Sequence, residues 1–150
     1  MARLFLTYLL FIFPFVSTAQ SNETAQKYLE NTLGYKIHTY KSSGKDTQVI
    51  IYALKFNNCT LNYNIQKKTK REIEQFTVRI GLNGLSKISM NKTKEGNYVL
   101  RLWTKGKSII KEYADGNLVH EASQTIPMKR ADLKALKYLE ILTNTCKNNH

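Results

Sequence analysis

The run "TQVIIYALKFNNCTLNYNIQ" at residues 47–66 decides the fold, because its pattern predicts two strands joined by a turn. In its second half, apolar residues alternate with polar ones, as in a strand with one buried face. The apolar residues of that half are Cys59, Leu61, Tyr63 and Ile65. The first half, residues 47–56, is apolar on nearly both faces, which is typical of a strand covered on each side. Asn57 and Asn58 lie between the halves and favour a tight turn, so the run predicts an antiparallel hairpin.

The same two-residue period continues downstream and predicts more short strands joined by charged or glycine-containing turns. These strands are expected near residues 74–82, 86–92, 97–106 and 108–113. Residues 117–128 have a weaker period and form either a seventh strand or an irregular return. The order of the strands predicts an antiparallel meander.

Helices are predicted at both ends of this meander. From residue 21, an apolar residue recurs at every fourth position as far as Ile37, and Gly34 offers an earlier end to the helix. Near the C-terminus, apolar residues recur at spacings of four, three and four, which defines one stripe of a helix that lies on the sheet. That stripe consists of Ala135, Leu139, Leu142 and Cys146, with Leu136 beside it.

The first 19 residues have the features of a cleavable export signal. Arg3 precedes an apolar run that contains Pro14, and the small residues 17–19 predict cleavage after Ala19. The run is shorter than the roughly 20 apolar residues that a membrane-spanning helix needs. We therefore expect a secreted or periplasmic protein whose mature chain begins at Gln20, forms one globular domain over residues 20–150 and has no transmembrane segment.

The chain is strongly basic, with 23 Lys and Arg residues against 11 Asp and Glu. Such a charge attracts anionic partners outside the cell: lipid head groups, acidic polysaccharide or, least expected of the three, nucleic acid. A composition rich in Lys and Asn also explains the excess, as do lysines that protect exposed strand edges.

The two cysteines, Cys59 and Cys146, each lie on the apolar face of a predicted element. In an exported domain this favours a disulfide that joins the sheet to the last helix, the alternative being two buried free thiols. A nucleophilic cysteine would need a nearby histidine, and no local motif links either thiol to His38, His120 or His150. The spacing does not predict a metal site, and no motif indicates a catalytic residue or a cofactor.

Two turns concentrate positive charge and are the candidate anion-binding residues. The first contains Lys67, Lys68, Lys70 and Arg71, and the second contains Lys105 and Lys107 with Trp103 nearby. If the turns meet at one end of a barrel they would form an anion-binding rim, where Trp103 or Tyr98 stacks on a sugar or base. Each turn alone is typical of a solvated loop.

The strand order, the phrase "RIGLNGLSKISMNKTKEGNYVLRLWTKG" with its corner residues Leu85 and Ile88, and the final helix resemble the pleckstrin-homology and GRAM-like superfold. The likeness covers residues 47–147 and implies a bent, nearly closed barrel. The C-terminal region is also similar to small exported bacterial proteins that carry no activity to transfer. The residues of that likeness are Ile126, Pro127, Ala131, Ala135, Leu136, Tyr138, Leu139 and Cys146. The N-terminal helix leaves a cystatin-like or NTF2-like sheet as an alternative.

Together these observations predict an α+β fold: an N-terminal helix, an antiparallel meander of six to seven strands forming a bent sheet or PH-like barrel, and a C-terminal helix packed on it. The expected function is a non-enzymatic exported binding domain that contacts anionic surfaces through its basic turns. The alternatives are a carrier that holds a small apolar ligand between sheet and helix, and an enzyme or enzyme inhibitor whose site is assembled from distant loops.

Overall fold

A computed structural model describes residues 21–34, 36–42, 45–94, 96–128 and 130–148. The expected signal sequence, its cleavage site and Gln20 lie outside the described residues. Within the described ranges, no helix is both long enough and apolar enough to cross a lipid bilayer.

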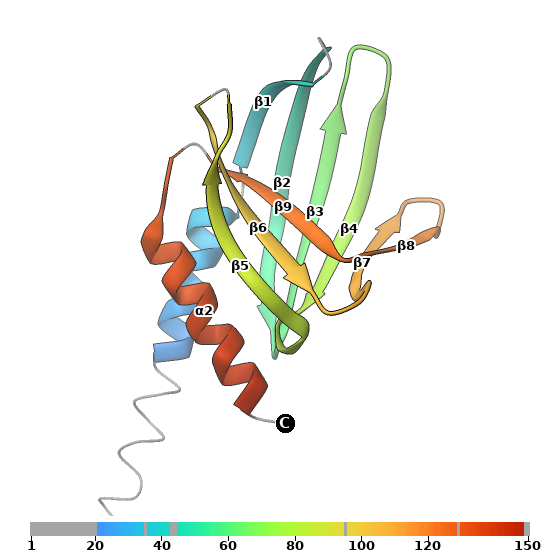
Figure 1. Cartoon of the computed structure of the whole chain (residues 1–150). Helices are drawn as coiled ribbons and strands as arrows, with labels where there is room; N and C mark the ends of the chain where they lie inside the picture. The colour runs from blue at the N-terminus through green and yellow to red at the C-terminus, as the bar shows by residue number, and fades with distance from the viewer. Residues whose placement is uncertain (1–20, 35, 43–44, 95, 129, 149–150) are drawn as a thin grey trace, which may run out of the picture.

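Within these residues, nine strands form two antiparallel sheets, and helices cover them at one side (Figure 1). The strands are β1 (Lys36–Ser42), β2 (Lys45–Asn57), β3 (Thr60–Lys68), β4 (Ile73–Gly81), β5 (Leu85–Lys92), β6 (Tyr98–Thr104), β7 (Ile109–Tyr113), β8 (Leu118–Glu121) and β9 (Ser123–Met128). The larger sheet has the order β1-β2-β3-β4-β7-β8, and the smaller one has the order β5-β6-β9. The predicted α+β class and bent antiparallel sheet are confirmed, but the strands do not close into a barrel.

The N-terminal helix is shorter than its apolar spacing predicts. It covers residues 21–33, and Ile37 lies instead in β1, opposite Ile50 of β2. Gly34 explains the early end, because a Cβ atom at this position would lie 2.1 Å from the carbonyl oxygen of Glu30. Only a residue without a side chain fits this approach, and the chain then leaves the helix. The prediction that Ile37 continues the helical stripe is therefore wrong.

The weak period of residues 117–128 arises because two strands lie in this segment. β8 ends at Glu121 and pairs with β7 in the larger sheet, whereas β9 begins at Ser123 and pairs with β6 in the smaller sheet. One residue, Ala122, separates them, so a single strand with a single period does not exist here.

A β-bulge explains why the first half of the central hairpin is apolar on both faces. The pairing of β2 with β3 shifts between Tyr52 and Lys55, and Ala53 has a φ angle of +54°. Before the bulge Ile51 is buried, and after it Leu54 is buried, an odd position followed by an even one. The extra residue changes which positions face the core, as a bulge does in general.

The two helices pack on the core and on each other. Apolar residues of the N-terminal helix and of α2 (Leu133–Asn148) are buried, and the predicted stripe of α2 is confirmed. The buried apolar residues are Ala25, Leu29 and Leu33 in the first helix, and Ala135, Leu139, Leu142 and Cys146 in α2. Asp132 caps α2 by accepting the backbone N–H of Ala135 at 2.9 Å, and its other carboxylate oxygen accepts the hydroxyl of Tyr28 at 2.9 Å. One carboxylate therefore starts the second helix and binds the first.

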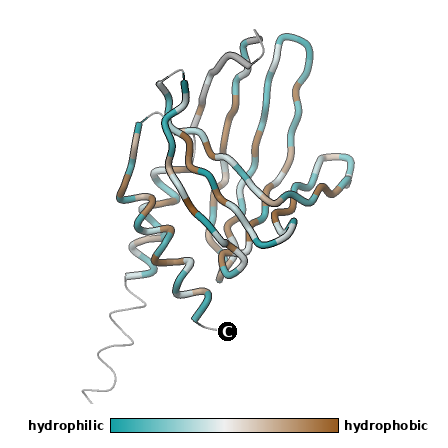
Figure 2. The backbone as a smooth tube through the Cα atoms, in the orientation of Figure 1, coloured by the Kyte–Doolittle hydropathy of each residue, from teal (hydrophilic) through white to brown (hydrophobic). Residues whose placement is uncertain are grey.

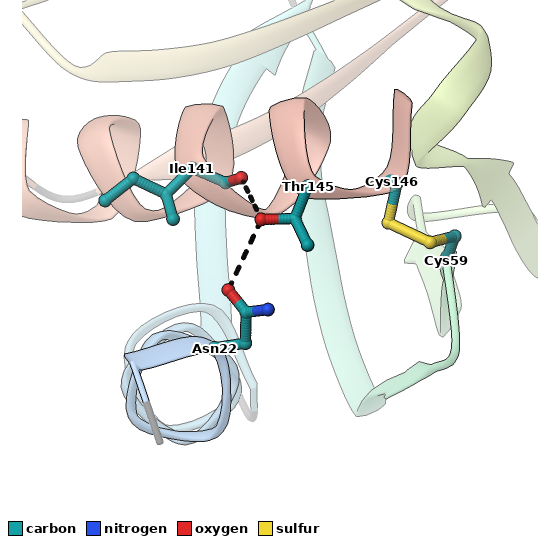
Figure 3. The surroundings of a disulfide bond; sticks show 5 residues. All are labelled: Asn22, Cys59, Ile141, Thr145 and Cys146. Atoms are coloured by element: carbon teal, nitrogen blue, oxygen red, sulfur yellow. Dashed lines mark hydrogen bonds between the residues drawn. A yellow bond between two sulfur atoms is a disulfide. The ribbon is translucent and has the colours of Figure 1, made fainter. Parts of the chain in front are cut away.

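Cys59 and Cys146 form a disulfide, as predicted, with their Cα atoms 5.6 Å apart. Figure 3 shows Cys59 at the turn between β2 and β3 and Cys146 on the last part of α2. Close by, the Thr145 hydroxyl donates to the Ile141 carbonyl at 3.0 Å and lies 3.4 Å from an Asn22 side-chain oxygen of the N-terminal helix. The larger sheet and both helices therefore meet at this end of the molecule.

Replacing both cysteines with serine should lower the free energy of unfolding by about 2–4 kcal/mol, because the bridge restricts a long loop of the unfolded chain. Urea denaturation followed by circular dichroism measures the change. A reducing agent should shift the midpoint of the natural protein and leave the double variant unaffected. Two thiols that react with an alkylating reagent in the unreduced protein would contradict the disulfide.

Candidate functional site

A cleft with a volume of about 580 Å³ lies between the larger sheet and the smaller one. Its walls come from β1, β2, β3, β7 and β8 on one side, and from β6, β9 and the loop between β5 and β6 on the other. This volume is within the usual range for small-molecule pockets, about 300–1,000 Å³. No described helix residue is in its lining, so the cleft lies in a different place from the expected ligand space between sheet and helix.

The larger sheet gives the cleft an apolar floor beside its charged groups. Val49 and Ile65 supply this surface from the adjacent strands β2 and β3. Along β3 the same face continues to Lys67, because residues 65 and 67 are two positions apart. Val49 lies directly opposite Lys67 in the register of β2 with β3. The floor therefore changes from aliphatic to cationic within one strand spacing.

A buried ion pair stands at one side of the cleft. Lys111 of β7 is 8% exposed, and its Nζ atom lies 2.7 Å from the carboxylate of Glu121 on β8. The same ammonium group lies over the ring of Phe76, 5.3 Å from the ring centre. Burial of a lysine ammonium is costly unless a carboxylate accepts its hydrogen bonds, and Glu121 supplies that acceptor.

Lys67 approaches the same aromatic ring without an equivalent partner. Its Nζ atom lies 5.1 Å from the centre of the Phe76 ring and 3.7 Å from a carboxylate oxygen of Glu74. That separation is too long for a hydrogen bond, which needs about 2.7–3.2 Å for an N–H donor and an oxygen acceptor. Two ammonium groups therefore lie within cation–π distance of one ring, but only Lys111 is held by a close carboxylate.

Two buried hydroxyl groups at the cleft have no hydrogen-bond partner among the described residues. They belong to Thr93, which lines the cleft, and to Tyr63, which is not in the lining but is close to the lining residue Gln124. Burial raises the pKa of the Tyr63 hydroxyl; the neighbouring Gln124 side chain opposes this rise, and the charge of Glu121 adds to it. Gln124 is close enough to influence that pKa but does not meet the geometry of a hydrogen bond. Unpaired buried hydroxyls are unusual and indicate a place where a bound molecule or water is expected.

The two basic turns, which were expected to form one anion-binding rim, lie far apart in the structure. Lys68, Lys70 and Arg71 are exposed at the tip of the β3–β4 hairpin, whereas Lys105 and Lys107 follow β6 at the opposite end of β4 (Figure 1). Nine residues of β4 separate these ends, which corresponds to about 30 Å of extended chain. The two turns therefore do not combine into one rim.

The remaining predicted residues fall at different places. Lys67 faces the cleft and not the hairpin tip, and Tyr98 also lines the cleft. Trp103 is half-buried on β6, where the Nζ atom of Lys87 lies 5.2 Å from its ring centre, so its stacking partner is a residue of this chain. The contact of the Phe76 ring with Lys67 and Lys111 was not predicted from the sequence.

The chemistry of the cysteines is settled by their disulfide, which leaves neither thiol free to act as a nucleophile. His120 is exposed on β8, and His150 lies outside the described residues. Across the described ranges, no group of three or more His, Cys, Asp or Glu side chains could hold a metal ion.

Sequence reasoning missed Lys111, Glu121, Thr93 and Gln124. One signal was present: Lys111 occupies an inward position of the apolar strand "SIIKEY", where a charged residue needs a partner. The identity of that partner follows only from the pairing of β7 with β8. No family model, curated protein or solved structure matches the chain.

Replacing Glu121 with glutamine should lower the free energy of unfolding by about 1–3 kcal/mol, because it leaves the buried Lys111 ammonium without its carboxylate. The double change Lys111→Met with Glu121→Leu should recover most of this loss, since it removes both charges. Thermal and urea unfolding measure the effect. As a control, Glu112→Gln breaks the exposed pair with Arg79 and should cost no more than about 1 kcal/mol. Equal losses from the two glutamine variants would contradict the structural importance of the buried pair.

Proposed function

We propose that the protein is a non-enzymatic binding protein that holds a small, largely apolar molecule in the cleft between its two sheets. The observation that supports this proposal most strongly is the combination of an aliphatic floor with buried polar groups that lack partners. Ligand pockets in proteins typically have this composition, with a few polar groups that fix the orientation of the bound molecule.

The open edge of the cleft favours binding and release over permanent burial. β1 and β9 both contribute to the lining, and they are edge strands of different sheets. Thr39 of β1 and Thr125 of β9 are exposed, so the cleft is reached from solvent between them. A small molecule can therefore enter without separation of any paired strands.

Replacing Val49 with tryptophan should weaken binding of a neutral apolar probe by about tenfold or more, a loss of about 1.4 kcal/mol, because Val49 shares the cleft-facing side of the sheet with Lys67 and the larger side chain occupies the cleft. Circular dichroism verifies that the variant is folded. N-phenyl-1-naphthylamine is a suitable probe, since its fluorescence rises in apolar surroundings. Titration of the natural protein and of the variant gives the two dissociation constants.

Gln75→Trp is the matched control, because Gln75 is an exposed residue of β4 outside the cleft lining. This variant should bind the probe as the natural protein does. Probe binding that is equal in both tryptophan variants, or absent from the natural protein, would reject the proposed cleft.

A second candidate function is contact with an anionic surface through the tip of the β3–β4 hairpin. Lys68, Lys70 and Arg71 are exposed there and have no carboxylate partner among the described residues. Ile73, directly opposite Lys68, is 58% exposed. The turn is also ordered, because the Thr69 hydroxyl accepts the backbone N–H of Glu72 at 3.1 Å.

Figure 2 shows this tip as a hydrophilic end of the molecule that extends away from the helices. Cations that surround one exposed aliphatic side chain suit the interface of an anionic bilayer, where the charges meet phosphate and the apolar group enters the head-group region. This arrangement favours lipid head groups over acidic polysaccharide as the partner.

The double change Lys68→Gln with Lys70→Gln should reduce adsorption to vesicles that contain phosphatidylglycerol, because each basic residue near such a surface contributes about 1 kcal/mol. Co-sedimentation at low and at physiological salt measures the bound fraction. Lys105→Gln with Lys107→Gln removes the same charge at the other end of β4 and should have a smaller effect. Equal losses from both pairs would show that total charge, and not the hairpin tip, governs adsorption.

A further inference from the structure

We infer that the molecule bound in the cleft carries one negatively charged group, a carboxylate, and that Lys67 binds this group. The inference rests on the proposed function, because it assigns the ligand class of the same cleft. It depends on which polar groups of the cleft already have hydrogen-bond partners among the described residues.

The charged side chains of the lining have different amounts of unused hydrogen-bonding capacity. Lys111 and Glu121 bind each other at 2.7 Å, so neither is available to a ligand without the loss of a buried pair. Lys67 has three N–H donors and no acceptor at hydrogen-bond distance among the described residues, since Glu74 lies at 3.7 Å. The Lys67 side chain is 37% exposed, so its N–H donors are accessible to solvent.

Binding of a molecule in the cleft changes that balance. A ligand on the aliphatic floor lies beside Lys67, because Val49 is directly opposite this residue in the sheet and both line the cleft. Such a ligand displaces water from the ammonium group, and an ammonium that loses its water without gaining an acceptor is unfavourable. A neutral apolar ligand carries this cost, whereas a carboxylate replaces the lost hydrogen bonds with charge-assisted ones.

The opposite wall is compatible with the same ligand. Its polar groups are neutral donors or acceptors, including the unpartnered hydroxyl of Thr93, whose backbone N–H donates to the Asn97 carbonyl at 2.7 Å and fixes the loop. A cationic ligand finds no carboxylate in the lining except Glu121, which Lys111 already occupies. The cleft therefore favours an amphipathic acid: an apolar body on Ile65 and Val49, with its carboxylate at Lys67.

Three compounds with the same alkyl chain test this inference: dodecanoate, dodecan-1-ol and dodecyltrimethylammonium. Displacement of N-phenyl-1-naphthylamine from the natural protein should give the tightest binding for dodecanoate. Lys67→Gln should weaken dodecanoate binding by about 10-fold to 100-fold, the range expected for one hydrogen bond to a charged group, and should leave dodecanol binding within about threefold. Dodecanol binding also verifies that the variant is folded.

Two further variants separate a local contact from a general effect of charge. Lys68→Gln removes the same charge from the next residue of β3, on the exposed side, and should leave dodecanoate binding within about twofold because water and salt screen that position. Lys67→Arg keeps a cation in place and should retain the preference for dodecanoate over dodecanol.

Each outcome decides between the two proposals. Dodecanol that binds as tightly as dodecanoate, with both excluded by Val49→Trp, would overturn the carboxylate inference and leave the proposed binding function intact. Equal losses in Lys67→Gln and Lys68→Gln would also overturn the inference, since they would show a long-range charge effect. If none of the three compounds displaces the probe, and Val49→Trp binds the probe as the natural protein does, the proposed function fails and the inference fails with it.

Discussion

The passage of the chain from one sheet to the other at Ala122 is the constraint on which the cleft depends. Glu121 pairs with Ile109 in the larger sheet, and two residues later Ser123 pairs with Trp103 in the smaller sheet. The Ala122 carbonyl accepts the backbone N–H of Thr104 at 2.9 Å, which fixes this crossing against the smaller sheet. The two sheets are joined here, whereas β1 and β9 remain edges of separate sheets. Pro127 has no N–H to donate, which is consistent with an edge strand that does not extend its pairing. The opening therefore lies between β1 and β9.

The opposite end of the molecule is closed by apolar packing and by the disulfide. One face of β3 shows the transition between the two ends, because Leu61 and Tyr63 are fully buried and Lys67 is half-exposed. Both helices lie toward the end of the larger sheet that carries the turn between β2 and β3, as Figure 1 shows, and none of their described residues lines the cleft. The same alternating strand thus contributes core where helices cover the molecule and cleft wall where they do not.

Local periodicity explains which parts of the fold could be predicted from the sequence. The hairpin around Asn58, the stripe of α2 and the disulfide were predicted, because each depends on a repeat of two or of three to four residues within one element. The helix was wrongly extended to Ile37, because spacing alone does not show that Gly34 approaches the Glu30 carbonyl. The strands β8 and β9 were predicted as a single segment, because the amino-acid composition does not reveal that the chain changes sheets at Ala122. The pairing of Lys111 with Glu121 was missed because it depends on the register of β7 with β8.

The basic composition becomes informative only when each charge is assigned a partner. Lys67 and Lys111 lie at nearly the same distance from the Phe76 ring, yet the carboxylate of Glu121 neutralises only Lys111. In the sequence, Lys67 was assigned to a basic turn and Lys111 was not singled out, and nothing in their neighbours separates a structural charge from an available one. Only the folded structure distinguishes the two lysines. Lys111 has the carboxylate of Glu121 on the next strand at hydrogen-bond distance, whereas the carboxylate of Glu74, opposite Lys67, is too far away for a hydrogen bond. The excess of lysine over acidic residues therefore has a specific consequence at Lys67. Glu121, the carboxylate in the cleft lining, already binds Lys111 and does not neutralise Lys67.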